Sequence, residues 1–312
     1  MGKQMRPERS RARPRRPAAA AWLVALLLGM AVSSCASAPQ HDLAVQWYEL
    51  GNSWLDKGDW KHAGEAYSHA LALDSSLGAA SFNMARALTE AGDYDEALSI
   101  LDRLKVRDPK NVRVVSARAY VLYRKGEGEA ALAAYDEAVA LDPYAPDAVY
   151  NDALLQYAAG DPQKAADALK KLLSYKPDDA QSLDLLGAVE EKLGDSSAAI
   201  DAYEKARTLG KADAAALERL GRLYEAQRRF ADAIAALDAS TKADATRAGA
   251  WFALARLRLV VAEDGQAGLD ALKQALDHGF ADKSLAAALM AEPVVAEREK
   301  VADLLKTKAL YP

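Results

Sequence analysis

The most restrictive feature of this sequence is a pattern that recurs every 34 residues. Stepping along the chain from residue 44 without gaps gives six units, 44–77, 78–111, 112–145, 146–179, 180–213 and 214–247. The twentieth position of each unit is alanine: Ala63, Ala97, Ala131, Ala165, Ala199 and Ala233. A unit of this length forms one supersecondary structure that buries its apolar face against its neighbours. We therefore expect an elongated array of similar units rather than a single globular core.

Other recurring positions predict two antiparallel helices in each unit. The eighth position is always glycine or alanine, and small residues there and at position 20 let two helices approach closely. The fifteenth position is glycine except at Arg228, which suits the left-handed backbone that ends a helix. Aspartate follows this position in four units and can cap the second helix: Asp59, Asp93, Asp161 and Asp195. Proline at position 32 ends the second helix in three units: Pro109, Pro143 and Pro177.

Positions 24 and 27 vary together along the repeat. Tyrosine is paired with alanine in alternate units, and two leucines stand there in two of the others. One large residue beside a small one occupies a similar volume to two residues of medium size, which indicates packing between units. We therefore expect Tyr67, Tyr135 and Tyr203 to be core residues.

The first unit carries the residues that point to a known family. They are Trp47, Leu50, Gly51, Gly58, Trp60, Ala63, Tyr67 and Ala70. With the period of 34, this set resembles the tetratricopeptide repeat (TPR), a helix–turn–helix unit. The resemblance implies an all-α, right-handed superhelical solenoid of about six full repeats. Residues 248–281 resemble a degenerate seventh unit, and 282–312 a helical C-terminal cap, because the last repeat of such an array needs its open end covered.

Residues 1–34 have the features of a secretory signal peptide. Seven basic residues and one acid lie in 1–17, and an apolar run of 15 residues follows, from Ala18 to Val32. The run is shorter than the roughly 20 residues that span a bilayer, so it is typical of an export signal. The sequence Val-Ser-Ser-Cys at 32–35 resembles the bacterial lipobox, which implies that Cys35 is lipidated and becomes the mature N-terminus. The alternative is an ordinary signal peptide with an incidental cysteine. Residues 35–43 would then form the lipidated cysteine and a short tether.

Cleavage before Cys35 would leave an acidic protein. It removes seven of the 40 basic residues and one of the 45 acidic residues, which gives a net charge of −11. Such a chain does not bind nucleic acid or an anionic membrane surface by electrostatics. Membrane attachment would come from the lipid on Cys35. Ala36 stands where lipoproteins of the enteric type carry aspartate when they are kept in the inner membrane, so we expect an exported chain anchored to the outer membrane and facing the periplasm.

The resemblance also implies where a partner would bind. In this family the first helix of each repeat lines a concave groove, and the matching positions here carry aromatic rings, amides and arginines. Rings offer apolar area at a small entropic cost, and amides bond to a peptide backbone. The predicted groove residues are Tyr48, Asn52, Phe82, Asn83, Arg86, Arg113, Tyr120, Tyr123, Tyr150, Asn151 and Tyr157. The alternative is a solvated concave face that binds nothing.

Part of this groove resembles the carboxylate clamp of chaperone-binding relatives. Asn52, Asn83 and Arg113 match three clamp positions, but Tyr48 and Ala117 replace two of its cations. The clamp is therefore incomplete, and an exported lipoprotein would not meet those chaperones.

No set of residues with catalytic or metal-binding spacing is found in the sequence. The histidines, His41, His62, His69 and His278, are scattered, and no cysteine or acid pair completes a metal site. There is no G-x-S-x-G, no H-E-x-x-H and no phosphate-binding glycine loop. We therefore expect no enzymatic activity, no metal and no cofactor, and protein or peptide segments as partners.

Three functions agree with these features. The first is a lipid-anchored adaptor or scaffold that binds partner segments in the cell envelope. The second is a dedicated assembly factor, resembling the repeat lipoproteins that help insert outer-membrane proteins or localise pilus secretins. The third is a solute-binding accessory of a transporter.

Overall fold

The computed structural model describes residues 40–262 and 264–311, and its regular structure is helical throughout that part of the chain. The predicted all-α repeat fold is confirmed. The signal peptide, Cys35 and residues 36–39 of the tether lie outside the described residues. Within the described residues, no helix is long and apolar enough to cross a bilayer.

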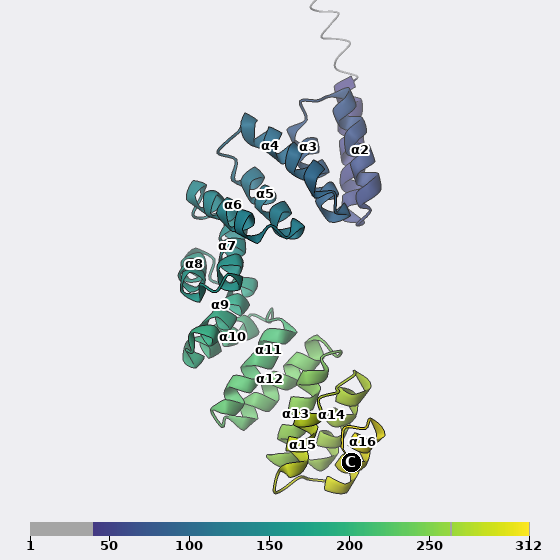
Figure 1. The fold of residues 1–312 in the computed structure, drawn as a ribbon, viewed down its shortest axis with the longest axis vertical. Coiled ribbons are helices and arrows are strands. Elements are labelled where there is room, and N and C mark those ends of the chain that lie inside the picture. The colour runs from purple at the N-terminus through teal and green to yellow at the C-terminus, as the bar shows by residue number, and fades with distance from the viewer. Residues whose placement is uncertain (1–39, 263, 312) are drawn as a thin grey trace, which may run out of the picture. The chain divides into compact units, whose positions relative to one another are not determined.

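The helices follow one another in antiparallel pairs (Figure 1). Residues 40–56 are helical at the start of the described chain. The others are α2 (Trp60–Leu73), α3 (Gly78–Ala91), α4 (Tyr94–Arg107), α5 (Val112–Lys125), α6 (Gly128–Leu141), α7 (Pro146–Ala158), α8 (Pro162–Tyr175), α9 (Ala180–Leu193), α10 (Ser196–Thr208), α11 (Ala214–Ala226), α12 (Phe230–Ala243), α13 (Ala248–Val260), α14 (Gly265–Asp277), α15 (Lys283–Ala291) and α16 (Arg298–Thr307).

The helices group into two compact units. The N-terminal unit ends at Pro109 and the C-terminal unit begins at Lys110. The N-terminal unit therefore contains the helix at 40–56 and α2 to α4, and the C-terminal unit contains α5 to α16.

The turn inside each repeat has the predicted left-handed residue. Gly58, Gly92, Gly126, Gly160 and Gly194 all have positive φ, between 73° and 93°. Arg228, the exception in the sequence, also has φ 59°, so the turn keeps its geometry even where a side chain makes it costly. Asp59, Asp161 and Asp195 accept a hydrogen bond from the third residue of the next helix, whereas Asp93 stands at the cap of α4 without one. Three of the four predicted caps are therefore made by the side chain.

Position 8 and position 24 of the same unit fit together. A Cβ atom built on Gly51 would lie 2.5 Å from Tyr67 Cε1, and one on Gly187 would lie 2.6 Å from Tyr203 Cδ1. Tyr67 and Tyr203 are buried at 0% and 1% exposure. The repeat pattern predicted that small residues of the same helix make room for these rings at the contact between units. In the structure, the glycine at position 8 on the first helix of the same unit also makes room for the ring.

A polar pair joins each repeat of the C-terminal unit to the next. Each pair links the second helix of one repeat with the first helix of the following repeat, at a separation of 20 residues. The pairs are Asp136–Gln156, Lys170–Glu190, Glu204–Tyr224 and Asp238–Arg258, at 3.5, 2.8, 2.6 and 3.3 Å. The repetition of the separation shows that neighbouring repeats pack with the same helix register.

The C-terminal helices α13 to α16 cover the end of the C-terminal unit (yellow-green to yellow in Figure 1). Their apolar side chains belong to one continuous core with α10 to α12, in which Phe252 and Phe280 stack at 4.0 Å between ring centroids. The loop before α16 is tied to this core, because Ala296 N–H donates to the carbonyl of Leu259 at 2.9 Å. Val301 and Leu305 of α16 are fully buried, so α16 belongs to the packed structure.

Candidate functional site

The first helices of the repeats in the C-terminal unit lie side by side. α7 contacts both α5 and α9, and α9 also contacts α11. Each of these helices is the first of its repeat, so the side that they turn away from the second helices is one continuous surface. This is the surface that the sequence predicted as the concave lining of repeats three to six.

Four tyrosines lie on α5 and α7 of this surface: Tyr120, Tyr123, Tyr150 and Tyr157. We call them the tyrosine surface. Tyr120 and Tyr123 are 36% and 47% exposed, and Tyr150 and Tyr157 are half-buried against an apolar core that includes Leu185. Large amphipathic rings of this kind, held on rigid helices and open to solvent, are typical of protein-binding surfaces.

The buried Tyr135 of α6 lies close to side chains of both α5 and α7. Burial raises the pKa of the Tyr135 hydroxyl, and the charges of Tyr120, Asp147 and Tyr123 raise it further. Groups of α5 and of α7 therefore surround the same buried hydroxyl. Arg124 lies over Tyr120, with its guanidinium carbon 5.6 Å from the ring centroid, and Arg124 Nη1 donates to the Tyr120 hydroxyl at 2.8 Å.

Carboxylates adjoin the tyrosine surface at Tyr150. Burial raises the pKa of Tyr150, and the charges of Asp179, Asp184 and Asp213 raise it further. Asp184 Oδ2 accepts the backbone N–H of Asp213 at 3.0 Å, while its buried Oδ1 has no partner within the described residues. Burial raises the pKa of Asp184 to about 6. The surroundings of Tyr150 are therefore anionic at neutral pH.

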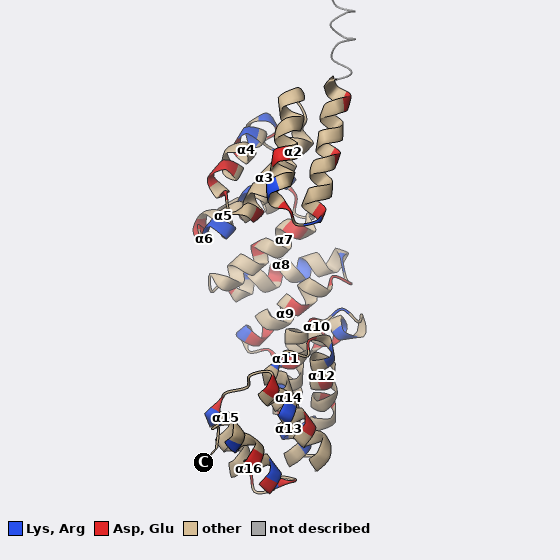
Figure 2. Ribbon diagram, turned by 90° about the vertical axis from the view of Figure 1, so that its right-hand side faces the viewer, with Lys and Arg blue, Asp and Glu red and all other residues tan. Residues whose placement is uncertain are grey.

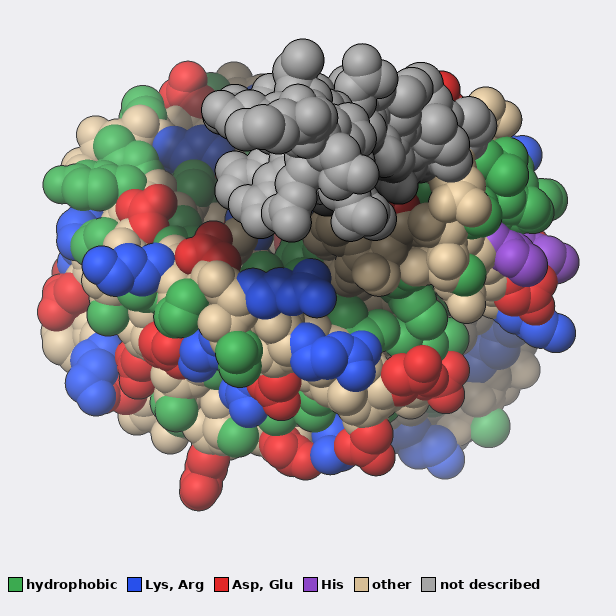
Figure 3. All heavy atoms as spheres, turned by 90° about the horizontal axis from the view of Figure 1, so that it is seen from above, with side chains coloured by type: hydrophobic (Ala, Val, Ile, Leu, Met, Phe, Trp, Pro, Cys, Tyr) green, Lys and Arg blue, Asp and Glu red, His purple; other side chains and the backbone are tan. Residues whose placement is uncertain are grey.

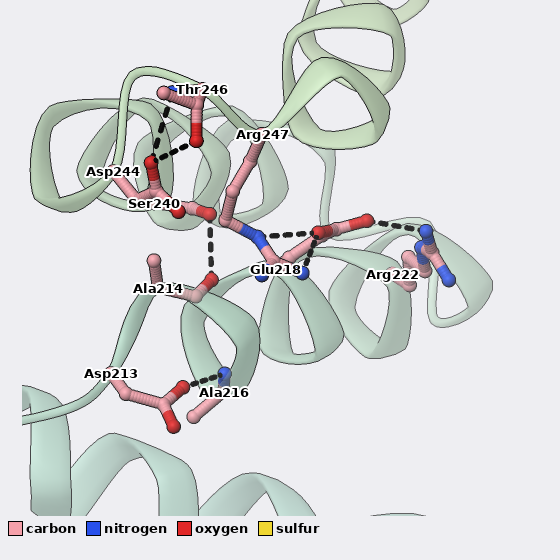
Figure 4. A network of polar contacts seen from close by, with 9 residues as sticks. All are labelled: Asp213, Ala214, Ala216, Glu218, Arg222, Ser240, Asp244, Thr246 and Arg247. Atoms are coloured by element: carbon pink, nitrogen blue, oxygen red, sulfur yellow. Dashed lines mark hydrogen bonds and ion pairs between the residues drawn. The ribbon is translucent and has the colours of Figure 1, made fainter. Parts of the chain in front are cut away.

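The surface continues along α9, α11 and α13 as a set of closed ion pairs. Glu218 is buried at 5% exposure and bonds to Arg222 and to Arg247, whose Nε lies 2.9 Å from Glu218 Oε2 (Figure 4). Glu225 pairs with Arg256 in the same way. The structure shows that these cations already have carboxylate partners, so they offer less to a ligand than the tyrosines do.

The predicted groove residues of the N-terminal unit form a hydrogen-bonded chain of their own. Asn52 Oδ1 accepts from the Tyr67 hydroxyl at 2.8 Å and from Asn83 Nδ2 at 2.9 Å. Arg86 Nη1 donates to Asn83 Oδ1 at 3.4 Å. Both amide oxygens are thus already used within the protein, and burial raises the pKa of Tyr67 to about 12, which keeps its hydroxyl a donor. Tyr48 stands beside this chain, its ring 6.1 Å from that of Tyr67.

The remaining predicted groove residues belong neither to the tyrosine surface nor to the hydrogen-bonded chain of the N-terminal unit. Phe82 is half-buried on α3, and Arg113 is exposed near the start of α5. Asn151 donates to the carbonyl of Asp147 in its own helix at 2.8 Å. Of the three clamp positions, Asn52 and Asn83 belong to the N-terminal unit and Arg113 to the C-terminal unit.

Asp152 is a buried acidic residue that the repeat pattern did not predict. Asp152 of α7 occupies position 7 of its repeat, where most units carry a large apolar residue, and it is 7% exposed. Burial and the nearby charge of Asp136 raise its pKa to about 6, and its Oδ1 has no partner within the described chain. An acidic residue at an otherwise apolar repeat position was the available signal.

The histidines of the first repeat pack against tryptophan. The ring of His69 stacks on Trp47 at 4.5 Å, and that of His62 lies 5.1 Å from Trp54. His62 Nδ1 is also 2.7 Å from Asp59 Oδ2. Among the described residues, no group of three or more histidine, cysteine or acidic side chains could hold a metal ion.

Two segments of the chain match known family models. Residues 55–119 and 150–216 match family models described as tetratricopeptide repeat. No curated protein matches the sequence. Among solved structures, the fold is similar to a tetratricopeptide repeat protein from Parabacteroides merdae ATCC 43184, with 18% identity over 80% of this chain and 98% of that chain and a TM-score of 0.55.

Two further structures share the fold. Pseudomonas aeruginosa pilF has 19% identity over 65% of this chain and 93% of its own, with a TM-score of 0.58. YrrB, described as a TPR protein with an unusual peptide-binding site, has 22% identity over 60% of this chain and 96% of its own, with a TM-score of 0.51. At these identities the likeness establishes the architecture alone.

Proposed function

We propose that this chain, which carries tetratricopeptide repeats, is a protein-interaction scaffold of the bacterial cell envelope that binds an extended partner segment on its tyrosine surface. The repeats themselves support a scaffold, because they build a long surface of side-by-side first helices.

The observation that supports the site is the tyrosine surface itself. Tyr120, Tyr123, Tyr150 and Tyr157 expose ring area on two neighbouring helices. Further along the same surface, Glu218 and Glu225 are already paired with arginines. Rigid aromatic side chains lose little entropy when a partner covers them, so they supply much of the binding energy at interfaces. We infer that the partner segment has apolar side chains that pack on these rings.

The carboxylates around Tyr150 add a preference for charge. Asp179, Asp184 and Asp213 act on the Tyr150 hydroxyl, and Asp184 has an unpaired oxygen. A partner that carries lysine or arginine beside its apolar residues would therefore associate faster and with better specificity than an acidic one. The preference should weaken as salt screens these charges.

The lipid anchor is proposed from the lipobox at 32–35. Cys35 is the one cysteine of the chain, and residue 40 already belongs to the first described helix. A chain spans at most about 3.6 Å per residue, so a lipid on Cys35 would keep the repeats close to their membrane. We propose the outer membrane, with the repeats in the periplasm.

Site-specific photo-crosslinking in the native cell tests the site. The probe amino acid is placed at Tyr120, and at Tyr144 as a matched control. Tyr144 is 64% exposed but lies in the loop between α6 and α7, where its ring packs against that of Tyr175 at the end of α8. We expect one dominant envelope protein to be captured at Tyr120 and not at Tyr144. Capture at Tyr144 alone would show that the tyrosine surface is not the working surface.

The captured protein would also separate the adaptor from the assembly factor. An outer-membrane barrel protein or a pilus secretin in the Tyr120 crosslink, with loss of that assembly when the gene is deleted, would favour the assembly factor. Any other envelope partner would favour the adaptor.

A further inference from the structure

The N-terminal unit contains a pocket that lies outside the proposed partner site. α2, α3 and α4 enclose about 260 Å³, and the apolar side chains of Leu71, Met84, Ile100 and Leu104 line it. Ligand sites for drug-sized molecules have roughly 300–1,000 Å³, so this pocket suits a smaller ligand. It is built from second-helix residues of the first two repeats and from α3, and it has none of the predicted groove residues in its wall.

A single departure from the repeat pattern accounts for the pocket. Position 4 of the second unit is Ser81, and Ser81 lines the pocket. The same position carries a large apolar residue in every other repeat: Trp47, Val115, Val149, Leu183, Leu217 and Trp251. Four of these are buried at 5% exposure or less. A small residue at a position that is normally filled leaves space between three helices, so the sequence itself encodes the pocket.

Two arginines stand at the wall of the pocket. Arg103 and Arg107 are four residues apart near the end of α4, so they lie on one side of that helix. Figure 2 shows basic residues toward the end of α4 and acidic residues at its start. Neither arginine has a carboxylate partner within the described residues; Arg103 Nη1 donates to Ser99 Oγ at 3.5 Å. This differs from Arg222, Arg247 and Arg256 of the C-terminal unit, which are all paired.

The rest of the polar lining is small. It consists of the hydroxyls of Ser68 and Ser81 and one acid, Glu96, in the first turn of α4. Arg103 and Arg107 lie two and three turns further along the same helix. The lining therefore has a net positive charge, which is located at the C-terminal half of α4. The rest of the wall is mostly apolar.

We propose that this pocket binds a small carboxylate with a short apolar body. The carboxylate would bond to the guanidinium groups of Arg103 and Arg107, whose planar donors match its two oxygens. The apolar body would lie against Met84 and Ile100 in the space that Ser81 leaves. This site is independent of the proposed function, since it lies off the tyrosine surface and in the other compact unit.

Calorimetric titration of the whole protein with hexanoate tests the proposal. We expect 1:1 binding, and hexanol should bind about 10-fold more weakly or worse, because it has no charge and cannot form the charge-assisted hydrogen bonds to the two arginines. The R103Q/R107Q double variant should lose binding to the same degree. K61Q, which removes an exposed cation of α2 in the same unit and outside the pocket, is the matched control.

Filling the pocket is the second test. Ser81→Leu restores the side-chain size of the other repeats and should abolish hexanoate binding while keeping helix content, and S53L at an exposed position of the first helix should change nothing. Unchanged hexanoate binding in either S81L or R103Q/R107Q would overturn the proposal, as would no heat of binding at millimolar hexanoate. If S81L fails to fold, the arginine variants still decide.

The source of the carboxylate is separated by a third titration. A tetrapeptide that ends in leucine is compared with the same peptide as its C-terminal amide. Tighter binding of the free-acid peptide than of hexanoate would identify a protein C-terminus as the ligand, and the reverse would identify a free short-chain acid. Equal binding of the amide and the acid would overturn the role of the arginines.

Discussion

Gly51 and Gly187 show how the removal of one side chain controls the packing of a repeat. Each lies where the first helix of a repeat crosses the second. The ring of a tyrosine from the same repeat occupies the space that a side chain on the glycine would take. The ring reaches further because the glycine has no Cβ, and its hydroxyl then finds a partner on the first helices, Asn52 for Tyr67 and Glu191 for Tyr203. One glycine therefore determines both a core contact and a polar contact of the predicted groove.

Replacing Gly187 with alanine should destabilise the C-terminal unit. The new Cβ would meet the Tyr203 ring at distances that no packed contact allows, and overpacking of a core costs about 1–3 kcal/mol. Gly64 is the matched control, since a Cβ there has nothing within 4 Å. Gly64→Ala in the interior of α2 should raise stability by about 0.5–1 kcal/mol. Urea unfolding followed by circular dichroism measures both, and equal effects would contradict the packing argument.

Asp152 should make stability depend on pH. Its pKa is raised to about 6 from 3.8, so the folded state holds the proton more tightly than the unfolded state. Stability is then highest below the unfolded pKa and falls as pH rises from about 4 through 6. A shift of one unit corresponds to about 1.4 kcal/mol, which sets an upper limit of ~3 kcal/mol for this loss.

The D152N variant isolates that effect. Its neutral side chain should make the protein more stable than the wild type at pH 8 and bring the two closer at pH 4.5, as measured by urea midpoints. Asp201→Asn, at an exposed position of α10, is the control and should follow the wild type at both pH values. A gain in D152N that is the same at both pH values would argue against titration of Asp152.

At the level of whole helices, the polar contacts between neighbouring repeats are a feature that the repeat pattern did not predict. The second helix of one repeat meets the first helix of the next through an apolar strip and one polar pair, always 20 residues apart. The chemical identity of the pair changes from carboxylate–amide to ion pair to carboxylate–phenol. What is constant is that a buried or half-buried polar group finds a partner, because leaving it unpaired costs free energy.

Stability should be sensitive to charge reversal in the Lys170–Glu190 pair, which joins α8 to α9. Glu190 is 4% exposed as a side chain and Lys170 is 55% exposed, with 2.8 Å between Nζ and Oε1. K170E should lower the free energy of unfolding by about 2–3 kcal/mol, because the buried carboxylate of Glu190 loses its partner and gains a like charge nearby. The loss should be smaller than for a fully buried ion pair, since solvent surrounds the side chain at position 170. The swapped variant K170E/E190K should recover part of it.

A double-mutant cycle by urea unfolding checks this prediction. K192E on α9 is the matched control, since Lys192 is exposed and should tolerate reversal. If K170E and E190K were additive in the double variant, the pair would not couple α8 to α9.

At the scale of the whole molecule, the feature that matters for binding is how charged and apolar side chains are distributed over the surface. The face in Figure 3 carries acidic and basic side chains interspersed with apolar ones. On the C-terminal unit, Glu218 and Glu225 are paired with arginines, so these charges have fewer hydrogen bonds to offer a partner than the tyrosine rings have apolar area. Binding in this arrangement should depend on ring area more than on charge.

Removing the rings should weaken partner capture without changing the fold. The triple variant Y120A/Y123A/Y150A is expected to lower affinity for the crosslinked partner by at least ~10-fold, since aromatic anchors commonly contribute more than 1 kcal/mol each. Tyr144→Ala controls for the loss of an exposed ring elsewhere. Helix content by circular dichroism should be the same in all three proteins, and an unaltered affinity of the triple variant would remove the tyrosine surface from the proposal.

Attachment to the membrane should depend on Cys35. In a bacterial host, C35S should lose metabolic labelling by a radioactive fatty acid and leave the membrane fraction, because the acidic repeats have no electrostatic attraction for the bilayer. Ser37→Ala, two residues beyond the lipobox, should remain labelled and membrane-bound. A wild-type chain that takes no label would leave an ordinary export signal as the explanation of residues 1–34.

The sequence alone determined the features that are set locally along the chain. Period, small residues at helix crossings, left-handed turn residues and aspartate caps each depend on neighbours within one repeat, and the structure has them where the period placed them, apart from the cap at Asp93. Tertiary structure decided which polar groups are paired. Asn52 and Asn83 bond to each other across a repeat boundary, Glu218 is enclosed by two arginines, and Ser81 leaves a pocket among three helices. These outcomes depend on which side chains of separate helices meet, and a repeat pattern records positions but not the partners that packing brings to them.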